Sequence, residues 1–311
     1  MDYLFALQNI REASPEFFTY IFLFISEFIM PAFLLAGGIY YWSINKEEGS
    51  YILMSYSFGY TINQTIKNIA CINRPWVLDS RLHVESHAAG GATGYSFPSG
   101  HTVTAASVGG GIANVQRKKK GVVILMMVLI LMVAFSRNWL GAHTMKDVVT
   151  AMCVAALAII LANVLRYFIS RKPELDTVVC AVAISINIII LLLLSLKKYE
   201  TVYNSDGSLL VDPYKMLSDC YTSLGTAVGF FTGWWLERHF IKFSMDVDKK
   251  TKIIRGVIGA IIGLSIQFVI GPMFKFAGDH WYHFIKYFLL FFVVMYLYPL
   301  CYTKFENRKR A

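Results

Sequence analysis

Two histidines stand beside basic and small polar residues in three short segments of the chain. The segments are Lys67-x6-Arg74-Pro75, Pro98-Ser99-Gly100-His101 and Ser136-Arg137-x5-His143-x3-Asp147. Side chains of these types bind phosphate oxygens and transfer protons in enzymes. Together the segments indicate phosphate chemistry.

The first segment carries two cations. Lys67 and Arg74 are seven residues apart, a spacing that places two side chains on one face of a helix, two turns apart. Pro75 disfavours helical geometry at the residue before it, so we expect Arg74 to leave the helix close to the water boundary. Both cations can then converge on one anion.

The second segment predicts the start of a helix that binds an anion. Ser99 to His101 are expected to open this helix, where free backbone N–H groups and the helix dipole attract phosphate oxygens. Gly100 lets the backbone approach a ligand closely, and the hydroxyl of Ser99 adds a donor. In the third segment, Arg137 offers a planar fork of N–H groups to the same oxygens.

A histidine and a carboxylate share the third segment. His143 and Asp147 are four residues apart at the predicted start of a helix, where they can lie on one face. The carboxylate can hold the imidazole in one tautomer and raise its nucleophilicity. The pair therefore predicts a nucleophilic histidine.

Each of these residues has a simpler interpretation when it is taken alone. Lys67 and Arg74 can be cations that reach from a helix end toward the membrane surface. Asp147 lies three residues after Thr144 and can close a capping box. His101 can belong to a capped helix without any chemical role. The occurrence of all three segments in one chain favours chemistry over these alternatives.

The elements that must position these segments are long and apolar. The chain has 311 residues, of which 56% are hydrophobic and only 16% charged, a composition far from that of a soluble domain. We predict an all-α fold, a polytopic membrane bundle of about nine helices, because each of about nine apolar stretches approaches the roughly 20 residues that span a bilayer core. The stretches lie near 17–42, 51–72, 101–115, 121–136, 147–168, 177–196, 219–236, 253–274 and 281–302.

The distribution of charge predicts the orientation of this bundle. The formal net charge is +9, and roughly two-thirds of the basic residues follow odd-numbered stretches, on the side that the positive-inside rule assigns to the cytoplasm. We expect an N-out/C-in protein of the plasma membrane, with the loops at 73–101 and 136–147 on the extracytoplasmic face. The positive charge then reflects topology, and no nucleic acid partner is expected.

Other sequence features argue against a metal site, a disulfide framework and a cleavable signal peptide. The five cysteines lie in or beside apolar stretches without CxxC spacing and are interpreted as small apolar residues. His83 and His87 flank Glu85 but are interpreted as loop histidines, so no metal and no cofactor are expected. The first apolar stretch is a full span without a basic segment before it, and we expect it to direct insertion itself.

The three segments, in this order, resemble the complete signature of the type 2 phosphatidic acid phosphatase superfamily, matched over residues 67–147. That superfamily includes lipid phosphate phosphatases, undecaprenyl diphosphate phosphatases, sphingosine-1-phosphate phosphatases, glucose-6-phosphatase and the soluble vanadium haloperoxidases. The resemblance implies a metal-free phosphohistidine mechanism in which His143 attacks phosphorus, Asp147 supports it and His101 protonates the leaving oxygen. It also implies that the phosphoryl oxygens are held by Lys67, Arg74, Ser99, Gly100 and Arg137.

The chain is expected to have three parts. Residues 1–50 form an N-terminal transmembrane helix and a cytoplasmic loop, 51–170 a catalytic core of four transmembrane helices with outer-face loops, and 171–311 additional C-terminal transmembrane helices. A lipid phosphate, held among membrane lipids, is the expected substrate, whereas a soluble sugar phosphate and the oligomeric state remain open. The alternatives are a phosphotransferase that uses an alcohol acceptor and a non-catalytic transporter or scaffold.

Overall fold

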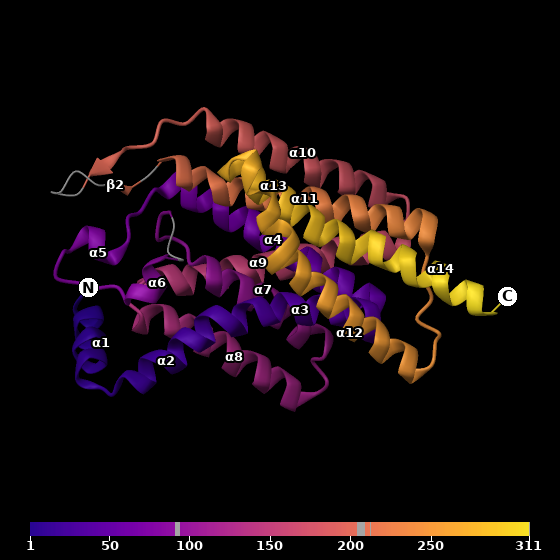
Figure 1. Cartoon of the computed structure of the whole chain (residues 1–311), viewed down its shortest axis with the longest axis horizontal. Coiled ribbons are helices and arrows are strands. Elements are labelled where there is room, and N and C mark those ends of the chain that lie inside the picture. The colour runs from indigo at the N-terminus through magenta and orange to yellow at the C-terminus, as the bar shows by residue number, and fades with distance from the viewer. Residues whose placement is uncertain (91–93, 204–208, 212, 311) are drawn as a thin grey trace.

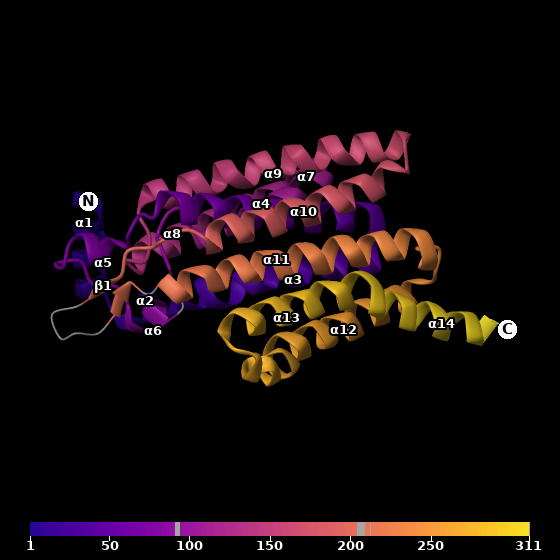
Figure 2. The same ribbon diagram turned by 90° about the horizontal axis from the view of Figure 1, so that it is seen from above.

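The computed structural model describes residues 1–90, 94–203, 209–211 and 213–310, and long helices dominate this part of the chain. The helices lie side by side along the long axis of the molecule, and the two termini lie at opposite ends (Figures 1 and 2). The helical elements are α1 (Asp2–Ala13), α2 (Glu16–Phe24), η1 (Ile25–Ile29), α3 (Met30–Ile39), η2 (Tyr40–Ile44), α4 (Lys46–Ala70), α5 (Pro75–Leu78), α6 (Ser86–Gly90), α7 (Gly100–Val115), α8 (Lys120–Trp139), α9 (Met145–Arg171), α10 (Leu175–Ser195), α11 (Pro213–Leu236), η3 (Glu237–Ile241), α12 (Lys249–Ser265), η4 (Ile266–Ile270), η5 (Gly271–Ala277), α13 (Asp279–Phe292), η6 (Val293–Leu297) and α14 (Tyr298–Arg310).

The all-α, polytopic membrane character of the chain is confirmed. Within the described residues, six helical segments are long and apolar enough to span a membrane. They are Glu16–Ile44, Lys120–Trp139, Met145–Arg171, Leu175–Ser195, Lys249–Ala277 and Asp279–Arg308. The other three predicted stretches fall on the helices α4, α7 and α11.

The position of α4 in the bundle explains its more polar sequence. This helix packs against α7, α9 and α11, and most of its residues are buried, including the polar side chains of Asn63, Gln64, Lys67 and Asn68. A helix that faces other helices rather than lipid can carry polar groups at membrane depth, where such groups often serve a function. The central position of α4 therefore accounts for its low hydropathy.

The first span changes its helical form just before a proline. Proline has no backbone N–H, and its ring collides with the carbonyl four residues earlier, which here belongs to Glu27. Residues Ile25–Ile29 form a π-helical turn immediately before Met30 and Pro31. Such widened turns accommodate a disrupted helical ladder, and this one packs against α8.

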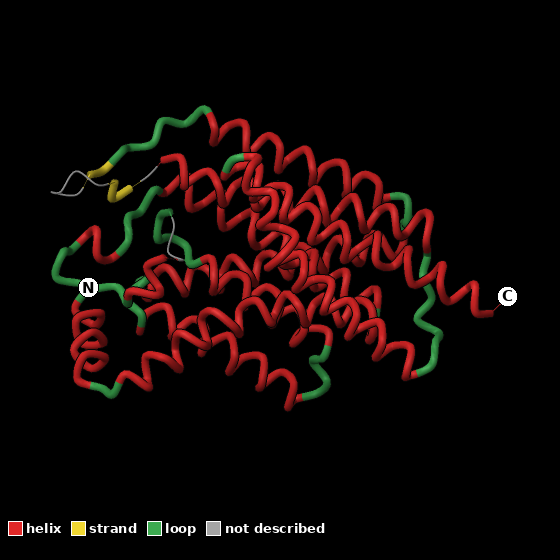
Figure 3. The backbone as a smooth tube through the Cα atoms, in the orientation of Figure 1, coloured by secondary structure: helices red, strands yellow, loops and turns green. Residues whose placement is uncertain are grey.

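Loops and short elements gather at the end of the bundle where the N-terminus lies (Figure 3). Helix α1 lies at this end, and Arg11 fixes it there by donating hydrogen bonds to the carbonyls of Trp139 and His83 at 2.9 and 2.7 Å. The strands β1 (Val202–Tyr203) and β2 (Leu209–Val211) form a short antiparallel pair before α11. Neither α1 nor the strand pair was predicted from the hydropathy pattern.

Candidate active site

The first signature segment spans a helix end. Helix α4 ends at Ala70, Cys71 adopts a left-handed conformation with φ of 47°, and Arg74 is extended with φ of −67° and ψ of 154°. The prediction that Lys67 and Arg74 share one helix face is therefore wrong, because the helix stops before Arg74. The expected effect of Pro75 on Arg74 is confirmed.

The second segment begins a helix, as predicted. Ser99 is the N-cap of α7, and its Oγ accepts hydrogen bonds from the backbone N and the Oγ1 of Thr102 at 3.4 and 3.0 Å. A Cβ placed on Gly100 would meet only Lys67 Nζ, at 3.9 Å. The glycine thus leaves open space between the first turn of α7 and the nearest cation.

The third segment joins α8 to α9. Arg137 lies in the last turn of α8, whereas His143 lies in the connecting loop, two residues before α9. The predicted placement of His143 on the same helix as Asp147 is therefore wrong, because Thr144 caps the helix after it. Thr144 and Asp147 do form the capping box, but Asp147 Oδ2 also lies 3.5 Å from His143 Nδ1.

A single cavity of about 130 Å³ brings most of the predicted site together. Its wall includes the signature residues Lys67, Arg74, Gly100, His101, Arg137 and His143. The other two, Ser99 and Asp147, are buried behind this wall as helix-capping residues. We call this space the central cavity.

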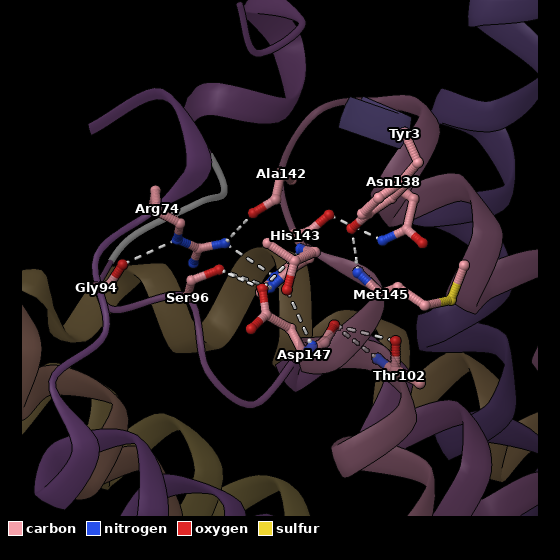
Figure 4. A network of polar contacts seen from close by, with 12 residues as sticks. Tyr3, Arg74, Gly94, Ser96, Thr102, Asn138, Ala142, His143, Met145 and Asp147 are labelled. Atoms are coloured by element: carbon pink, nitrogen blue, oxygen red, sulfur yellow. Dashed lines mark hydrogen bonds and ion pairs between the residues drawn. The ribbon is translucent and has the colours of Figure 1, made fainter. Parts of the chain in front are cut away.

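The hydrogen bonds of His143 define which ring nitrogen faces the cations. Arg74 Nη1 lies 2.9 Å from His143 Nε2 (Figure 4). Because a guanidinium only donates, Nε2 must accept this bond, which assigns the ring proton to Nδ1. Nδ1 lies on the side of Asp147. Asn138 Nδ2 donates to the carbonyl of His143 at 2.8 Å and holds its backbone.

Ser96 belongs to this arrangement and was not predicted. Its Oγ donates to Asp147 Oδ2 at 2.6 Å and lies 3.4 Å from His143 Nδ1 (Figure 4). The same carboxylate oxygen accepts a bond from the backbone N of Thr144 at 2.7 Å. The only sequence signal was a hydroxyl residue just before the Pro98 segment, which is too common to be informative.

Burial and nearby positive charge favour the neutral form of His143. Burial, followed by the positive charges of Arg74, Arg137 and Lys67, holds the pKa of His143 well below its ordinary value. Burial and the charge of Arg137 lower the pKa of Arg74 to about 9, which leaves its guanidinium protonated at neutral pH. Buried cations cost free energy unless an anion compensates them, so the central cavity favours an anionic ligand.

The first span also contributes to the site, which was not predicted. Arg137 Nη1 donates to Ser26 Oγ, and Glu27 Oε1 lies 3.9 Å both from that Nη1 and from His101 Nε2. These two residues belong to the π-helical turn before Pro31. An acidic residue inside an apolar span was the available signal, since ionisable groups in spans are rare and often functional.

Two family models match the chain. A model described as the PAP2 superfamily matches residues 48–171, and a model described as PAP2 superfamily phosphatase, transmembrane extension, matches residues 221–310. Together they cover more than half of the sequence. The chain belongs to the PAP2 superfamily. No curated protein and no solved structure matches this PAP2 protein.

The matched ranges contain all the predicted site residues but not every residue near the central cavity. The model of residues 48–171 includes all eight predicted site residues. Glu27 and Asp219, a cavity residue from α11, lie outside both ranges. Within the part of the chain that the structure describes, no three His, Cys, Asp or Glu residues are grouped as metal ligands would be.

Proposed function

We propose that this PAP2 protein hydrolyses the phosphate monoester or diphosphate of a membrane lipid through a phosphohistidine at His143. One observation carries the proposal: the Nε2 of a buried, neutral histidine faces a cavity lined by Lys67, Arg74 and Arg137. A lone pair on this nitrogen is the nucleophile, and the cations bind the oxygens of the group that it attacks.

In the first step, substrate binding transfers the Nη1 hydrogen bond of Arg74 from His143 Nε2 to a phosphoryl oxygen. The freed electron pair of Nε2 forms a bond to phosphorus, and the bond from phosphorus to the leaving oxygen breaks. His101, which the bound anionic substrate and Glu27 keep protonated in the complex, gives that oxygen its proton. The imidazole ring becomes cationic, with its proton on Nδ1. Asp147, which Ser96 holds in place, stabilises this charge.

In the second step, water replaces the alcohol. His101, now neutral, takes a proton from the water as its oxygen bonds to phosphorus, and the bond from phosphorus to His143 Nε2 breaks. Inorganic phosphate leaves, His143 returns to its neutral form and His101 is again protonated. Backbone N–H groups at the start of α7, beside Gly100, are placed to bind the oxygens in both steps.

A neighbouring apolar groove supports a lipid substrate. This groove of about 110 Å³ lies between α3, α4, α12 and α13, with Leu53, Phe268 and Phe291 among its lining residues. Leu34 and Tyr287 line both the groove and the central cavity. A lipid with its phosphate beside His143 can therefore place its hydrocarbon chain in the groove. Phe268 is exposed on the outside of the bundle, where lipid would enter.

The finer topology is part of this proposal. Together with the six apolar segments, helices α4, α7 and α11 form a nine-span bundle. Its N-terminus lies on the extracytoplasmic side and its C-terminus in the cytoplasm. Residues 51–170 are the catalytic core, and residues 171–311 are additional spans. The charge distribution supports this orientation, as does the position of the termini at opposite ends of the bundle (Figure 1). The site then faces the extracytoplasmic side of the plasma membrane.

The test is phosphate release by the purified protein in detergent or vesicles. The substrates are phosphatidate, phosphatidylglycerophosphate, undecaprenyl diphosphate, sphingosine 1-phosphate and glucose 6-phosphate. We expect release from at least one lipid, no activity in His143→Asn, and full activity in His87→Asn, which changes an exposed histidine of the outer loop.

Three outcomes would contradict the proposal. Release from glucose 6-phosphate alone would indicate a soluble substrate. Phosphate transfer to an added alcohol without release would indicate a phosphotransferase. Substrate binding or transport without turnover, unchanged in His143→Asn, would indicate a transporter or scaffold.

A further inference from the structure

Part of the central cavity wall has no task in the phosphoryl transfer described above. Asp219 from α11 and Gln64 from α4 line this wall together with Tyr287 from α13. Gln64 precedes Lys67 by three residues, so the two side chains lie on the same face of α4. This wall therefore stands directly beside the phosphate-binding cations.

Both polar side chains in this wall have unused hydrogen-bond acceptors. Gln64 is 2% exposed, and its Oε1 is buried without a hydrogen-bond partner among the described residues. Asp219 is only partly buried; its charge acts on Lys67 and Arg74, but its carboxylate makes no hydrogen bond or ion pair within the part of the chain that the structure describes. Buried acceptors are normally satisfied in native proteins, so the unsatisfied Oε1 of Gln64 at this wall points to a ligand.

The carboxylate of Asp219 is not suited to contact phosphoryl oxygens directly. A carboxylate repels phosphoryl oxygens, and Asp219 would weaken the pocket if only anionic oxygens entered it. A hydrogen-bond donor on the substrate reverses the sign of that interaction. The ligand that suits this wall is therefore a hydroxyl or an ammonium group close to the phosphate.

We propose that Asp219 and Gln64 form a subsite for a hydroxyl or ammonium group on the carbon next to the phosphate ester carbon of the substrate. The proposal rests on the proposed function and specifies its substrate class. Tyr287 lines both the central cavity and the apolar groove, and α13 packs against α11. A substrate that occupies both spaces passes between Leu34 and Tyr287, beside this wall.

The experiment compares three synthetic substrates with the same chain. Octadecyl phosphate has no donor, 2-hydroxyoctadecyl phosphate has a hydroxyl, and 2-aminooctadecyl phosphate has an ammonium group. We expect the wild-type protein to prefer a donor-bearing substrate, and Asp219→Leu to lower kcat/KM for it by roughly 10- to 100-fold, the range for a hydrogen bond to a charged group. The kcat/KM for octadecyl phosphate should stay the same or rise.

The variant Asp219→Asn distinguishes the hydroxyl substrate from the ammonium substrate, and its similar size makes misfolding less of a concern than in Asp219→Leu. Asp219→Asn is nearly isosteric and keeps an acceptor but loses the charge. It should retain most turnover of the hydroxyl substrate and lose the preference for the ammonium substrate. Gln64→Leu should act in the same direction as Asp219→Leu. Asp279→Leu, at the exposed start of α13, is the matched control and should change no substrate preference.

The outcomes separate this inference from the proposed function. If wild-type protein hydrolyses all three substrates without preference, or if both Asp219 variants change all three rates by the same factor, the subsite does not exist. In either case, hydrolysis of octadecyl phosphate by the wild-type protein that is lost in His143→Asn would leave the phosphatase proposal standing. If the wild-type protein hydrolyses none of the three and none of the natural lipids, the proposed function itself fails.

Discussion

Ser96→Ala removes one hydrogen bond from the carboxylate behind the proposed nucleophile. Ser96 and Asp147 are 1% and 2% exposed, and their oxygens are 2.6 Å apart. A hydrogen bond to a charged group contributes about 1.5–3 kcal/mol. Asp147 keeps its bond from the backbone N of Thr144 at 2.7 Å, so the helix start should remain intact.

The lost hydrogen bond should appear mainly in turnover. Asp147 is most strongly needed when His143 becomes cationic, and a less fixed carboxylate stabilises that charge less well. If most of the interaction is realised in the transition state, kcat falls by about 10- to 100-fold. Ser96 does not line the central cavity, so KM should change little. The assay is the initial rate of phosphate release over a range of lipid phosphate concentrations.

The control is Ser55→Ala. Ser55 is also completely buried, but its Oγ donates to the carbonyl of Tyr51 within its own helix at 3.0 Å. This variant should keep wild-type kcat, and thermal unfolding in detergent should show whether both variants remain folded. A folded Ser96→Ala protein with wild-type kcat would refute the role assigned to Ser96.

Four further predictions concern the general acid His101, the phosphate-binding Arg137, the nucleophile His143 and the topology. His101→Asn should reduce lipid phosphate hydrolysis by about 10²- to 10⁴-fold but spare p-nitrophenyl phosphate, whose leaving group needs no proton, and equal losses would reject its role as acid. Arg137→Lys should weaken inhibition by vanadate, since an ammonium cannot bind two oxygens through a planar fork, and unchanged inhibition would show that Arg137 does not bind the phosphoryl oxygens. Because burial and nearby cations lower the pKa of His143, this histidine stays neutral at pH values below its usual pKa of about 6.5. As the pH is lowered, kcat/KM corrected for substrate ionisation should therefore begin to fall only below about pH 6.5, and a fall on this acidic side that begins above about pH 6.5 would contradict the assignment. In intact cells, a membrane-impermeant thiol reagent should label a cysteine introduced at Asp79 but not one at Lys118, and the reverse pattern would overturn the N-out topology.

Local sequence rules predicted the parts of the site that depend on neighbouring residues. Ser99 caps α7 because a hydroxyl residue before a helix can accept a bond from the first free N–H groups. Arg74 leaves the helix because of Pro75. The apolar stretches predicted the helices because a chain segment in a bilayer must satisfy its own backbone hydrogen bonds, and an α-helix does so within one segment.

Residues brought to the site by packing could not be predicted in this way. Glu27 and Asp219 are separated by most of the chain, and they reach the same region only because η1 packs on α8 and α11 packs on α4. Helix boundaries were also poorly determined by spacing alone. Thr144 caps α9 directly after His143, so His143 lies outside the helix that contains Asp147. The left-handed Cys71 ends α4 after Lys67, so Arg74 lies outside the helix that contains Lys67.

The most direct test of the phosphohistidine account is to trap the intermediate. Purified protein is mixed with a ³²P-labelled lipid phosphate that it hydrolyses, quenched in alkali within milliseconds to seconds, and digested for peptide mapping. We predict label that is stable to base and labile to acid, located on the peptide containing His143 and absent from His143→Asn. A wild-type protein that releases phosphate in the same experiment with no label on that peptide, or with label on another residue, would contradict the mechanism.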